Sequence, residues 1–459
     1  MQRFLYFIII IISSKCYADI SPKDYGWNQA TTDKERYIVL QKTHQKALIL
    51  GTNVDYTDMG EMNIEVPYPN SSILVSTCTD FKDAVINVRN NVSDQFIFQR
   101  VSSMKPITIK KELLDGNDFS SIPELSNGTK LLVIEDRNVW TKRISYGYDV
   151  YRKDILLLTN GIAENTVICS YSPDTSEPIC LYCEVSTDKK VFQNLTFNRT
   201  KDSTCKSFLI RISGENNFSL NNLKIFTPPS DMVGDRVFYI ENSTNLTFDN
   251  IKVEETYSSA DAYGYAISLE NIWNSKFTNL TGNMKWGYFG NNNINTAILE
   301  GCDINRFDVH SYGKDIYCSN CTFKDCYNQY SSLFGTVTYN SCHFINFTPI
   351  LLEYSYNAFT PFEIIMNDCI WDITSDTNNY IVNCSTVTTD HNTRQELYYR
   401  YLPEIKIHNL TINSKSKDVY IYSQQGFSKG YPVTMSNQIR PDLSEITINA
   451  DTKLHFYKK

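Results

Sequence analysis

The sequence predicts an elongated, all-β solenoid made of short stacked coils, and three observations indicate it. Strand-like segments predominate from about residue 96 to the C-terminus. From about residue 190 a short pattern recurs at intervals of about 19 to 29 residues until a longer final gap, a spacing typical of solenoids. In each copy, two apolar residues flank an Asn, Gly, Ser or Asp that favours a turn. The copies are residues 191–197, 219–225, 247–253, 276–280, 298–304, 317–323, 338–344, 365–371 and 406–412.

The turn residue of each copy bends the strand, and the next apolar side chain then points inward. Stacked coils repeat about every 4.8 Å, so this inward position forms a ladder along the solenoid. The predicted ladder consists of Leu195, Leu223, Ile251, Leu280, Cys302, Cys321, Cys342, Cys369 and Leu410. Buried cysteine behaves as a small hydrophobic residue, which favours a packing role for the four cysteines over metal binding.

The first 18 residues resemble a secretory signal peptide, with Arg3 ahead of a short apolar run and small residues before a predicted cleavage after Ala18. A lipoprotein signal with Cys16 as the lipidated residue is disfavoured by Lys15, because a small residue normally occupies that position. No other apolar run approaches the roughly 18 residues that span a bilayer. We therefore expect a secreted protein, extracellular, at the cell surface or periplasmic, without a transmembrane anchor.

The bulk composition narrows the class of ligand. The formal net charge is -8 and the pI is about 5.4, which argues against nucleic acid as a partner. A neutral or polar ligand, or an acidic one bound with the help of a cation, fits this charge better.

Twelve of the 13 cysteines remain after removal of Cys16, an even number consistent with disulfides in an oxidising compartment. The candidates for pairing are Cys169, Cys180, Cys183 and Cys205. The spacing of Cys180 and Cys183 also occurs in metal and redox motifs, but no second CxxC and no nearby histidine complete a zinc site. Disulfides and buried thiols both remain open.

Four further segments complete the predicted organisation. Residues 19–75 form an N-terminal extension with strand-like stretches at 37–40 and 47–50. Phe81, Ala84, Val85 and Val88 have the i, i+3, i+4, i+7 spacing of an amphipathic helix, predicted near residues 79–90. The solenoid is expected over residues 76–450, including this helix, and residues 451–459 form a C-terminal tail.

The helix near residue 79, followed by irregular coils with NLTF-like bends, resembles the right-handed parallel β-helix of the pectin-lyase-like superfamily. The resemblance covers roughly residues 76–450. It implies that the helix caps the open N-terminal end of the coil and that ligands lie along an elongated outer face. It does not specify one activity, because this solenoid occurs in several enzyme classes and in non-enzymes.

Known enzyme signatures of the superfamily are missing from the chain. Polygalacturonase-like hydrolases carry NTD, Asp-Asp, GHG and RIK segments, and Arg143-Ile144 and Arg211-Ile212 only echo the last of these. Pectate-lyase-like enzymes use calcium-binding acidic clusters with a basic residue. Asp308, Asp315 and Lys314 match such a cluster in composition alone, so no metal ligand is assigned and calcium is expected only if the protein is a lyase.

Counting outward from the repeat nevertheless predicts a site. Trp286, Asp308 and Tyr327 lie four residues after the last inward position of three successive coils, and Tyr288, His310 and Gln329 lie six residues after it. Stacking would join these six into a patch, with Tyr312 and Lys314 close by. Aromatic faces beside hydrogen-bonding groups suit sugar rings.

Each predicted site residue has a role. Asp308 and His310 are candidates for general base and acid, and Lys314 for neutralising an acidic substrate or its transition state. Substrate-binding roles fall to Trp286, Tyr288, Tyr312, Tyr327 and Gln329. The competing interpretation is that these residues are ordinary polar and aromatic positions of a β-helix surface.

The sequence thus predicts a secreted β-helix protein that engages an extracellular polysaccharide or other glycan, with a lyase or a hydrolase as the expected enzyme if it is catalytic. The alternative is a non-catalytic surface or adhesive protein whose β-helix is a rigid rod. A depolymerase like a phage tailspike is disfavoured by the signal peptide. The sequence specifies neither the saccharide nor the oligomeric state.

Overall fold

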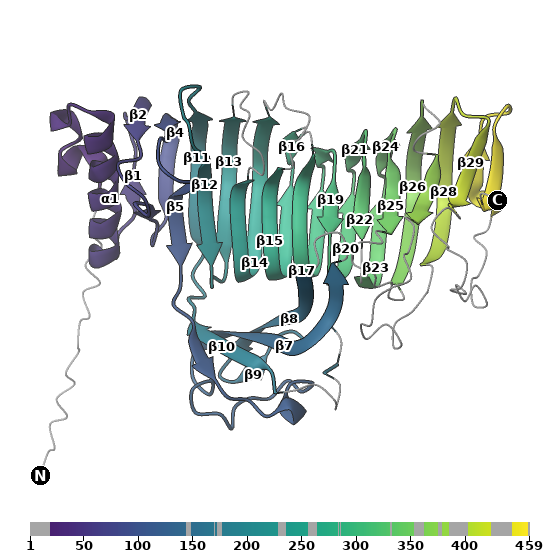
Figure 1. Ribbon diagram of the computed structural model, residues 1–459, viewed down its shortest axis with the longest axis horizontal. Helices are drawn as coiled ribbons and strands as arrows, with labels where there is room; N and C mark the ends of the chain where they lie inside the picture. The colour runs from purple at the N-terminus through teal and green to yellow at the C-terminus, as the bar shows by residue number, and fades with distance from the viewer. Residues whose placement is uncertain are drawn as a thin grey trace, which may run out of the picture.

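The computed structural model describes residues 19–143, 148–168, 170–171, 177–227, 236–255, 264–282, 284, 286–330, 333–352, 362–374, 379–384, 403–423 and 443–457. These residues form a long parallel β-helix with a helix across one end and a separate small sheet beneath it (Figure 1). The predicted signal peptide, residues 1–18, lies outside the described residues.

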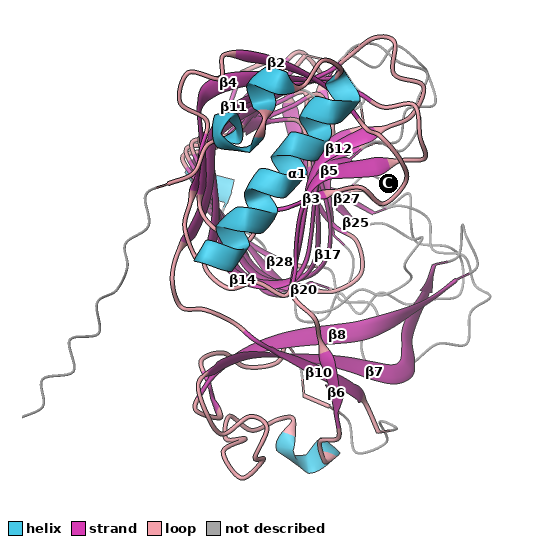
Figure 2. Ribbon diagram, turned by 90° about the vertical axis from the view of Figure 1, so that its left-hand side faces the viewer, coloured by secondary structure: helices cyan, strands magenta, loops and turns pink. Residues whose placement is uncertain are grey.

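The helix that covers the N-terminal end is α1, Asp33–Leu50, preceded by the 3₁₀ turns η1, Pro22–Tyr25, and η2, Trp27–Gln29. Thr32 and Glu35 form a capping box at its start, and Gly51 ends it in a left-handed conformation. Its buried side chains, Tyr37 and Leu40 among them, join the core of the first coil, and the helix crosses the end of the coil in Figure 2. The strand-like stretches expected at 37–40 and 47–50 are therefore parts of this helix.

The prediction of a helix near residues 79–90 is wrong, because this segment is strand β4, Thr79–Arg89. Lys82 and Asp83 both have positive φ, 51° and 59°, and bend the strand in the middle. Phe81 before the bend and Ala84 after it both point inward, which imitates helical spacing. A two-residue bend inside a strand thus produces the same hydrophobic pattern as a helix.

Each complete coil has three parallel faces. The first face contains β3 Ile73–Leu74, β5 Gln95–Val101, β12 Ser207–Ser213, β19 Phe307–Val309, β22 Tyr327–Tyr330, β25 Thr348–Leu352, β27 Tyr380–Cys384, β29 Asp418–Tyr422 and β31 Lys453–Tyr457. It also contains the first parts of β14 Arg236–Glu255, β15 Tyr265–Thr278 and β17 Gly287–Glu300. Because β31 pairs with β29, the coil continues into the predicted C-terminal tail.

The second face contains β1 Val54–Asp55, β20 Gly313–Ser319 and β23 Leu333–Asn340, together with parts of the long strands β4, β14, β15 and β17 and of β11 Lys190–Arg199, β13 Phe218–Thr227, β26 Phe362–Ile373 and β28 Glu404–Ser414. The third face contains β2 Glu61–Glu65, β16 Thr281–Gly282, β18 Asp303–Ile304, β21 Thr322–Lys324, β24 His343–Ile345 and β30 Ile446–Ile448, with the ends of the long strands. The turn η5, Leu443–Glu445, precedes β30.

The bends between the second and third faces are the predicted turn residues. Asn194, Asn222, Asn250 and Asn279 all have φ between 50° and 61°, a left-handed conformation that asparagine tolerates well. Their side chains also bond along the stack, since Nδ2 of Asn222 donates to Oδ1 of Asn194 at 2.8 Å. The asparagines therefore set the bend of each coil and join successive coils.

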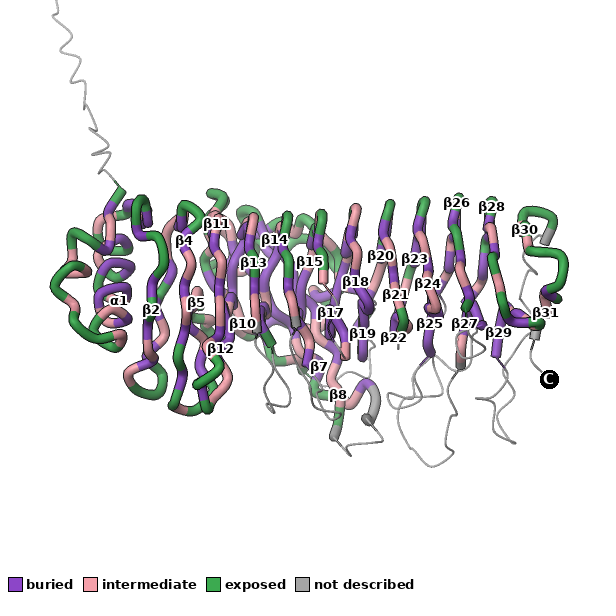
Figure 3. Tube along the Cα trace, turned by 90° about the horizontal axis from the view of Figure 1, so that it is seen from above, coloured by how far each residue is buried: buried purple, intermediate pink, exposed green. Residues whose placement is uncertain are grey.

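The predicted inward ladder is confirmed. Leu195 pairs with Leu223, Leu223 with Ile251, and Cys369 with Leu410. Backbone bonds connect the intervening coils, as where Thr322 N donates to Cys302 O at 2.7 Å. All nine ladder residues are buried, and buried positions recur in coil after coil in Figure 3.

A second sheet, which the sequence did not reveal, is inserted between β5 and β11. It is antiparallel, in the order β6 Lys105–Ile107, β10 Ile179–Glu184, β7 Thr129–Arg143, β8 Tyr148–Thr159 and β9 Ile162–Ala163, with the turn η3 Lys111–Leu113. The β-helix predicted over residues 76–450 thus contains an inserted sheet that the prediction did not include. Figure 1 shows the inserted sheet below the β-helix.

The described cysteines named as disulfide candidates, Cys180, Cys183 and Cys205, are free thiols, and Cys169 lies outside the described residues. Cys180 and Cys183 belong to the hydrophobic clusters on opposite faces of the inserted sheet, so they cannot pair with each other. Burial raises the pKa of both thiols to about 12. In the parts of the chain that the structure describes, no helix is long and apolar enough to cross a membrane.

Candidate functional site

The predicted site lies on the first face, where β17, β19 and β22 succeed one another. Arg306, Asp308 and His310 alternate along one strand and its end, so their side chains point to the same outer side. Gly290 of β17 and Gln329 of β22 flank this position, since Gly290 pairs with Asp308 and Tyr330 pairs with Val309.

Asp308 is the centre of this cluster. Its Oδ2 lies 2.5 Å from Nε of Arg306 and 3.2 Å from Nε2 of His310, and its Oδ1 accepts from the backbone N–H of Gln329 at 2.8 Å. The side chain of Asp308 is fully buried and that of Arg306 is almost fully buried. Burial alone would raise the pKa of Asp308, but the charge of Arg306 and the hydrogen bond with His310 outweigh it and lower that pKa.

Tyr265 reaches this cluster from β15, two coils away. Its hydroxyl donates to Oδ2 of Asp308 at 3.1 Å and lies 3.1 Å from Nε2 of His310. The ring crosses the intervening coil over Gly287 and Gly290, where any Cβ would collide with it. Burial and the adjacent Asp308 carboxylate raise the pKa of Tyr265 well above its ordinary value.

Arg306 lies between aromatic rings. Its guanidinium carbon is 4.8 Å from the ring centre of Trp286, 4.4 Å from that of Tyr327 and 5.9 Å from that of Tyr265. One terminal nitrogen also donates to Oε1 of Gln329 at 2.8 Å. The cation therefore fixes two half-buried rings, Trp286 and Tyr327, at the outer surface.

The structure brings together five of the eight predicted site residues: Trp286, Asp308, His310, Tyr327 and Gln329. Arg306, Tyr265, Gly287 and Gly290 were missed as parts of the site. The position of Arg306, two residues before Asp308, was a usable signal, because alternate residues of a strand share a side. The reach of Tyr265 across two glycines had no such signal.

Tyr288, Tyr312 and Lys314 are not parts of this cluster, which corrects the predicted patch. Tyr288 is fully buried in the core, where its ring adjoins Gly282 and its hydroxyl donates to Ile251 O at 3.4 Å. Lys314 lies on the second face, in register with Asn295 and Phe334, and within the described residues it forms no ion pair with Asp308.

Tyr312 is also fully buried and packs edge-on against Trp140 of the inserted sheet, with ring centres 5.5 Å apart. Its hydroxyl bonds to Asp154 of β8, and Phe334 completes the contact. Tyr312 therefore fastens the inserted sheet to the β-helix.

The surroundings of Asp308 limit its part in proton transfer. Both oxygens of Asp308 face donors or cations, and its pKa is lowered rather than raised, so it is poorly suited to act as an acid or a base. Within the described residues no group of three or more His, Cys, Asp or Glu side chains is placed to hold a metal ion.

Comparison with protein-family models and with curated proteins gives no match. Solved structures do match. The tailspike gp54 of Acinetobacter baumannii bacteriophage AP22, in complex with A. baumannii capsular saccharide, is 13% identical with a TM-score of 0.56, covering 95% of this chain and 70% of that chain. The tailspike gp61 of Pseudomonas phage phi297 is 12% identical with a TM-score of 0.47, covering 92% of this chain and 83% of that chain. The Streptococcus pneumoniae surface adhesin PfbA is 8% identical with a TM-score of 0.41, covering 96% of this chain and 92% of that chain. At these identities the likeness shows the fold, a right-handed parallel β-helix of the pectin-lyase-like type.

Proposed function

We propose that this protein is a secreted β-helix protein that binds extracellular polysaccharide on its first face, at the surface formed by Trp286 and Tyr327 above Arg306. The observation that carries the proposal is the pair of half-buried rings held on either side of a buried guanidinium. Because the rings are already held in place, a sugar that contacts their exposed parts costs them little side-chain freedom on binding.

The buried cluster beneath these rings supports a rigid binding surface. Arg306 is held by Asp308 and Gln329, and Asp308 is held in turn by Tyr265 and His310. Such mutual support fixes the rings in the same way as hydrogen bonds around a site fix the groups that touch a ligand. The saccharide bound by the AP22 tailspike is in keeping with a role of this fold in glycan binding.

Binding without cleavage is the form of the proposal that the geometry favours. A lyase or hydrolase that used the predicted residues Asp308, His310 and Lys314 would need them to reach one substrate together, whereas Asp308 is fully buried, His310 is 8% exposed and Lys314 lies on another face. The non-catalytic surface or adhesive protein is thus the closer description, with the β-helix as a rod that carries the glycan-binding surface.

A panel of bacterial capsular, plant and animal polysaccharides tests the proposal by affinity electrophoresis of the purified protein. Retardation by at least one polysaccharide is expected. Parallel incubations with calcium and with a chelator, read by reducing ends and by the absorbance of unsaturated products, should show no cleavage. Rapid release of either product would establish an enzyme instead, and failure to bind any of the polysaccharides would contradict the proposal.

Secretion is tested on the full-length precursor. Expression with its own N-terminus, followed by N-terminal sequencing of the exported protein, should find Asp19 as the first residue. Accumulation inside the cell of uncleaved protein, still carrying residues 1–18, would contradict export.

A further inference from the structure

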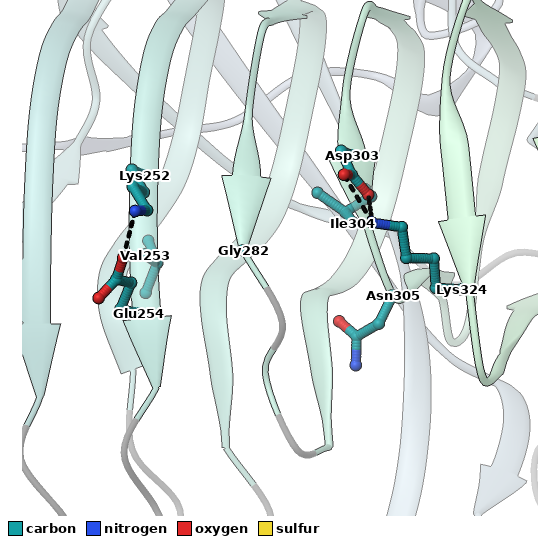
Figure 4. Close-up of a pocket in the computed structure, with 8 residues that line it drawn as sticks. All are labelled: Lys252, Val253, Glu254, Gly282, Asp303, Ile304, Asn305 and Lys324. Carbon is teal, nitrogen blue, oxygen red and sulfur yellow. Dashed lines mark hydrogen bonds and ion pairs between the residues drawn. The ribbon is translucent and has the colours of Figure 1, made fainter.

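A pocket of about 530 Å³ opens on the third face, and Figure 4 shows the residues that line it. This volume lies within the range of roughly 300–1,000 Å³ that small-molecule sites occupy. The pocket spans β14, β16, β18 and β21. The residues that matter for its chemistry are Lys252, Glu254, Gly282, Asp303, Asn305 and Lys324.

The pocket lies where two short strands of this face stand between longer ones. Strand β16 ends at Gly282 and its neighbour β18 ends at Ile304, whereas β14, which precedes them in the stack, continues to Glu255, and β21, which follows them, reaches Lys324. Gly282 has φ +153°, and a Cβ there would collide with the carbonyl oxygen of Val253 and with the ring of Tyr288. A side chain at position 282 would therefore not fit, and the pocket lies beside this glycine.

Asn305 provides a polar group at this gap. Its side chain is 6% exposed, and Nδ2 donates to the backbone oxygen of Met284. Its Oδ1 is buried and has no hydrogen-bond partner among the described residues. A buried acceptor without a donor costs free energy, so a ligand that brings a donor to this oxygen gains from the contact.

The charged residues described at the rim of the pocket form two ion pairs of opposite charges. Lys252 pairs with Glu254 on the β14 side, and Lys324 pairs with Asp303 at 2.6 Å on the other side, as Figure 4 shows. Among the described residues that line the pocket, two cations and two anions leave no net charge to attract an acidic or a basic ligand, yet both pairs supply hydrogen-bond donors and acceptors. Such a rim suits a neutral molecule with several hydroxyl groups.

We propose that this pocket binds one neutral sugar residue, with one of its hydroxyls donating to Oδ1 of Asn305 and others bonding to the Asp303–Lys324 pair. The inference rests on the proposed function, because it makes the pocket a subsite of the same saccharide. Asn305 directly precedes Arg306, whose guanidinium contacts Trp286 and Tyr327, so pocket and binding surface adjoin along the chain.

The test titrates the protein with methyl glycosides of glucose, galactose and mannose and with methyl glucuronide, by saturation-transfer NMR and calorimetry. At least one neutral glycoside should bind at least tenfold more tightly than the glucuronide. The double variant Asp303→Ala, Lys324→Ala should weaken binding at least tenfold, and Asn305→Ala should weaken it at least fivefold. The matched control Lys276→Ala, Glu300→Ala removes an equally exposed ion pair, 3.1 Å long and outside the pocket, and should bind like the wild type.

Thermal unfolding confirms that each variant is folded before binding is compared. Wild-type affinity in the Asp303, Lys324 double variant, preference for the glucuronide, or the absence of binding by all four glycosides would overturn the pocket proposal. Polysaccharide binding measured on the same samples separates the two proposals. If polysaccharide binding persists without any glycoside binding, the pocket proposal alone fails, whereas glycoside binding that needs Asp303 and Lys324, without polysaccharide binding, contradicts only the proposed function.

Discussion

Tyr265 and Asp308 lie on strands two coils apart, yet the tyrosine hydroxyl donates to Oδ2 of the aspartate at 3.1 Å. The coil between them carries glycine at both positions that the ring crosses, Gly287 and Gly290. Three successive coils are thus joined by one side chain, directly beneath the rings proposed to contact saccharide.

Gly290→Ala should disrupt this contact. The added Cβ would occupy the space of the Tyr265 ring, and overpacking of this kind costs about 1–3 kcal/mol of stability. Denaturant unfolding should show the loss, and Ser268→Ala, at the paired position of the adjacent coil, should stay close to the wild type. An unchanged unfolding midpoint for Gly290→Ala would show that the ring does not lie across the glycines.

Asp308→Asn should be strongly destabilising, because it leaves the buried Arg306 cation without its counter-charge. Breaking a buried ion pair in this way costs about 3–5 kcal/mol. Glu300→Gln removes one partner of a half-exposed pair with Lys276 and should cost at most about 1 kcal/mol. Equal losses in the two variants, measured by urea unfolding, would contradict the central role of Asp308.

Asp154 makes the stability of the inserted sheet depend on pH. Burial raises the pKa of this carboxyl to about 6, although Ile168 N–H, Arg152, Tyr171 and Tyr312 act against the rise. Because the folded-state pKa lies above the unfolded value of about 3.9, the stabilising contribution is fully present below about pH 4 and is lost as the pH rises through 6.

Asp154→Asn should therefore gain stability relative to the wild type as the pH rises. The difference in free energy of unfolding between variant and wild type should shift by about 2 kcal/mol in favour of the variant between pH 4 and pH 7. Unfolding curves at each pH measure this difference. A difference that stays constant over this range would show that Asp154 titrates normally.

The cysteines of the inward ladder should not react in the folded protein. Cys302, Cys321, Cys342 and Cys369 are each about 1% exposed, so a reagent cannot reach their sulfur atoms in the folded protein, whatever their ionisation. Cys78 and Cys205 are more exposed and should react with a thiol reagent within minutes. The number of thiols that react with the reagent before and after denaturation tests this prediction. A melting temperature that falls on addition of reductant would indicate a disulfide instead.

The coil could be predicted from sequence because its determinants are local. Asn194, Asn222 and their counterparts mark each bend, and the next apolar residue points inward. The helix near residue 79 was wrong because the bend at Lys82 and Asp83 shifts the inward positions into helical register. The cap at the N-terminus is real but consists of α1, whose capping box at Thr32 and Glu35 was present in the sequence.

The site could be predicted only in part, because its contacts cross between coils. Counting along the repeat placed Asp308 near Gln329, but it gave Tyr288 an outward position, whereas its ring fills the interior beside Gly282. Tyr312 looked like a neighbour of His310, but an inserted sheet that has no repeat covers it. Departures from regular coil geometry therefore decide which side chains reach the surface.

Polysaccharide affinity of ring variants tests the central claim most directly. With a polysaccharide from the panel that binds, Trp286→Ala and Tyr327→Ala should each weaken binding at least tenfold, while Tyr327→Phe, which keeps the ring, should stay within about threefold of the wild type. Removal of Tyr317, a 39% exposed ring on the second face, should leave the affinity unchanged. Wild-type affinity in folded Trp286→Ala and Tyr327→Ala would contradict the claim that this surface binds the saccharide.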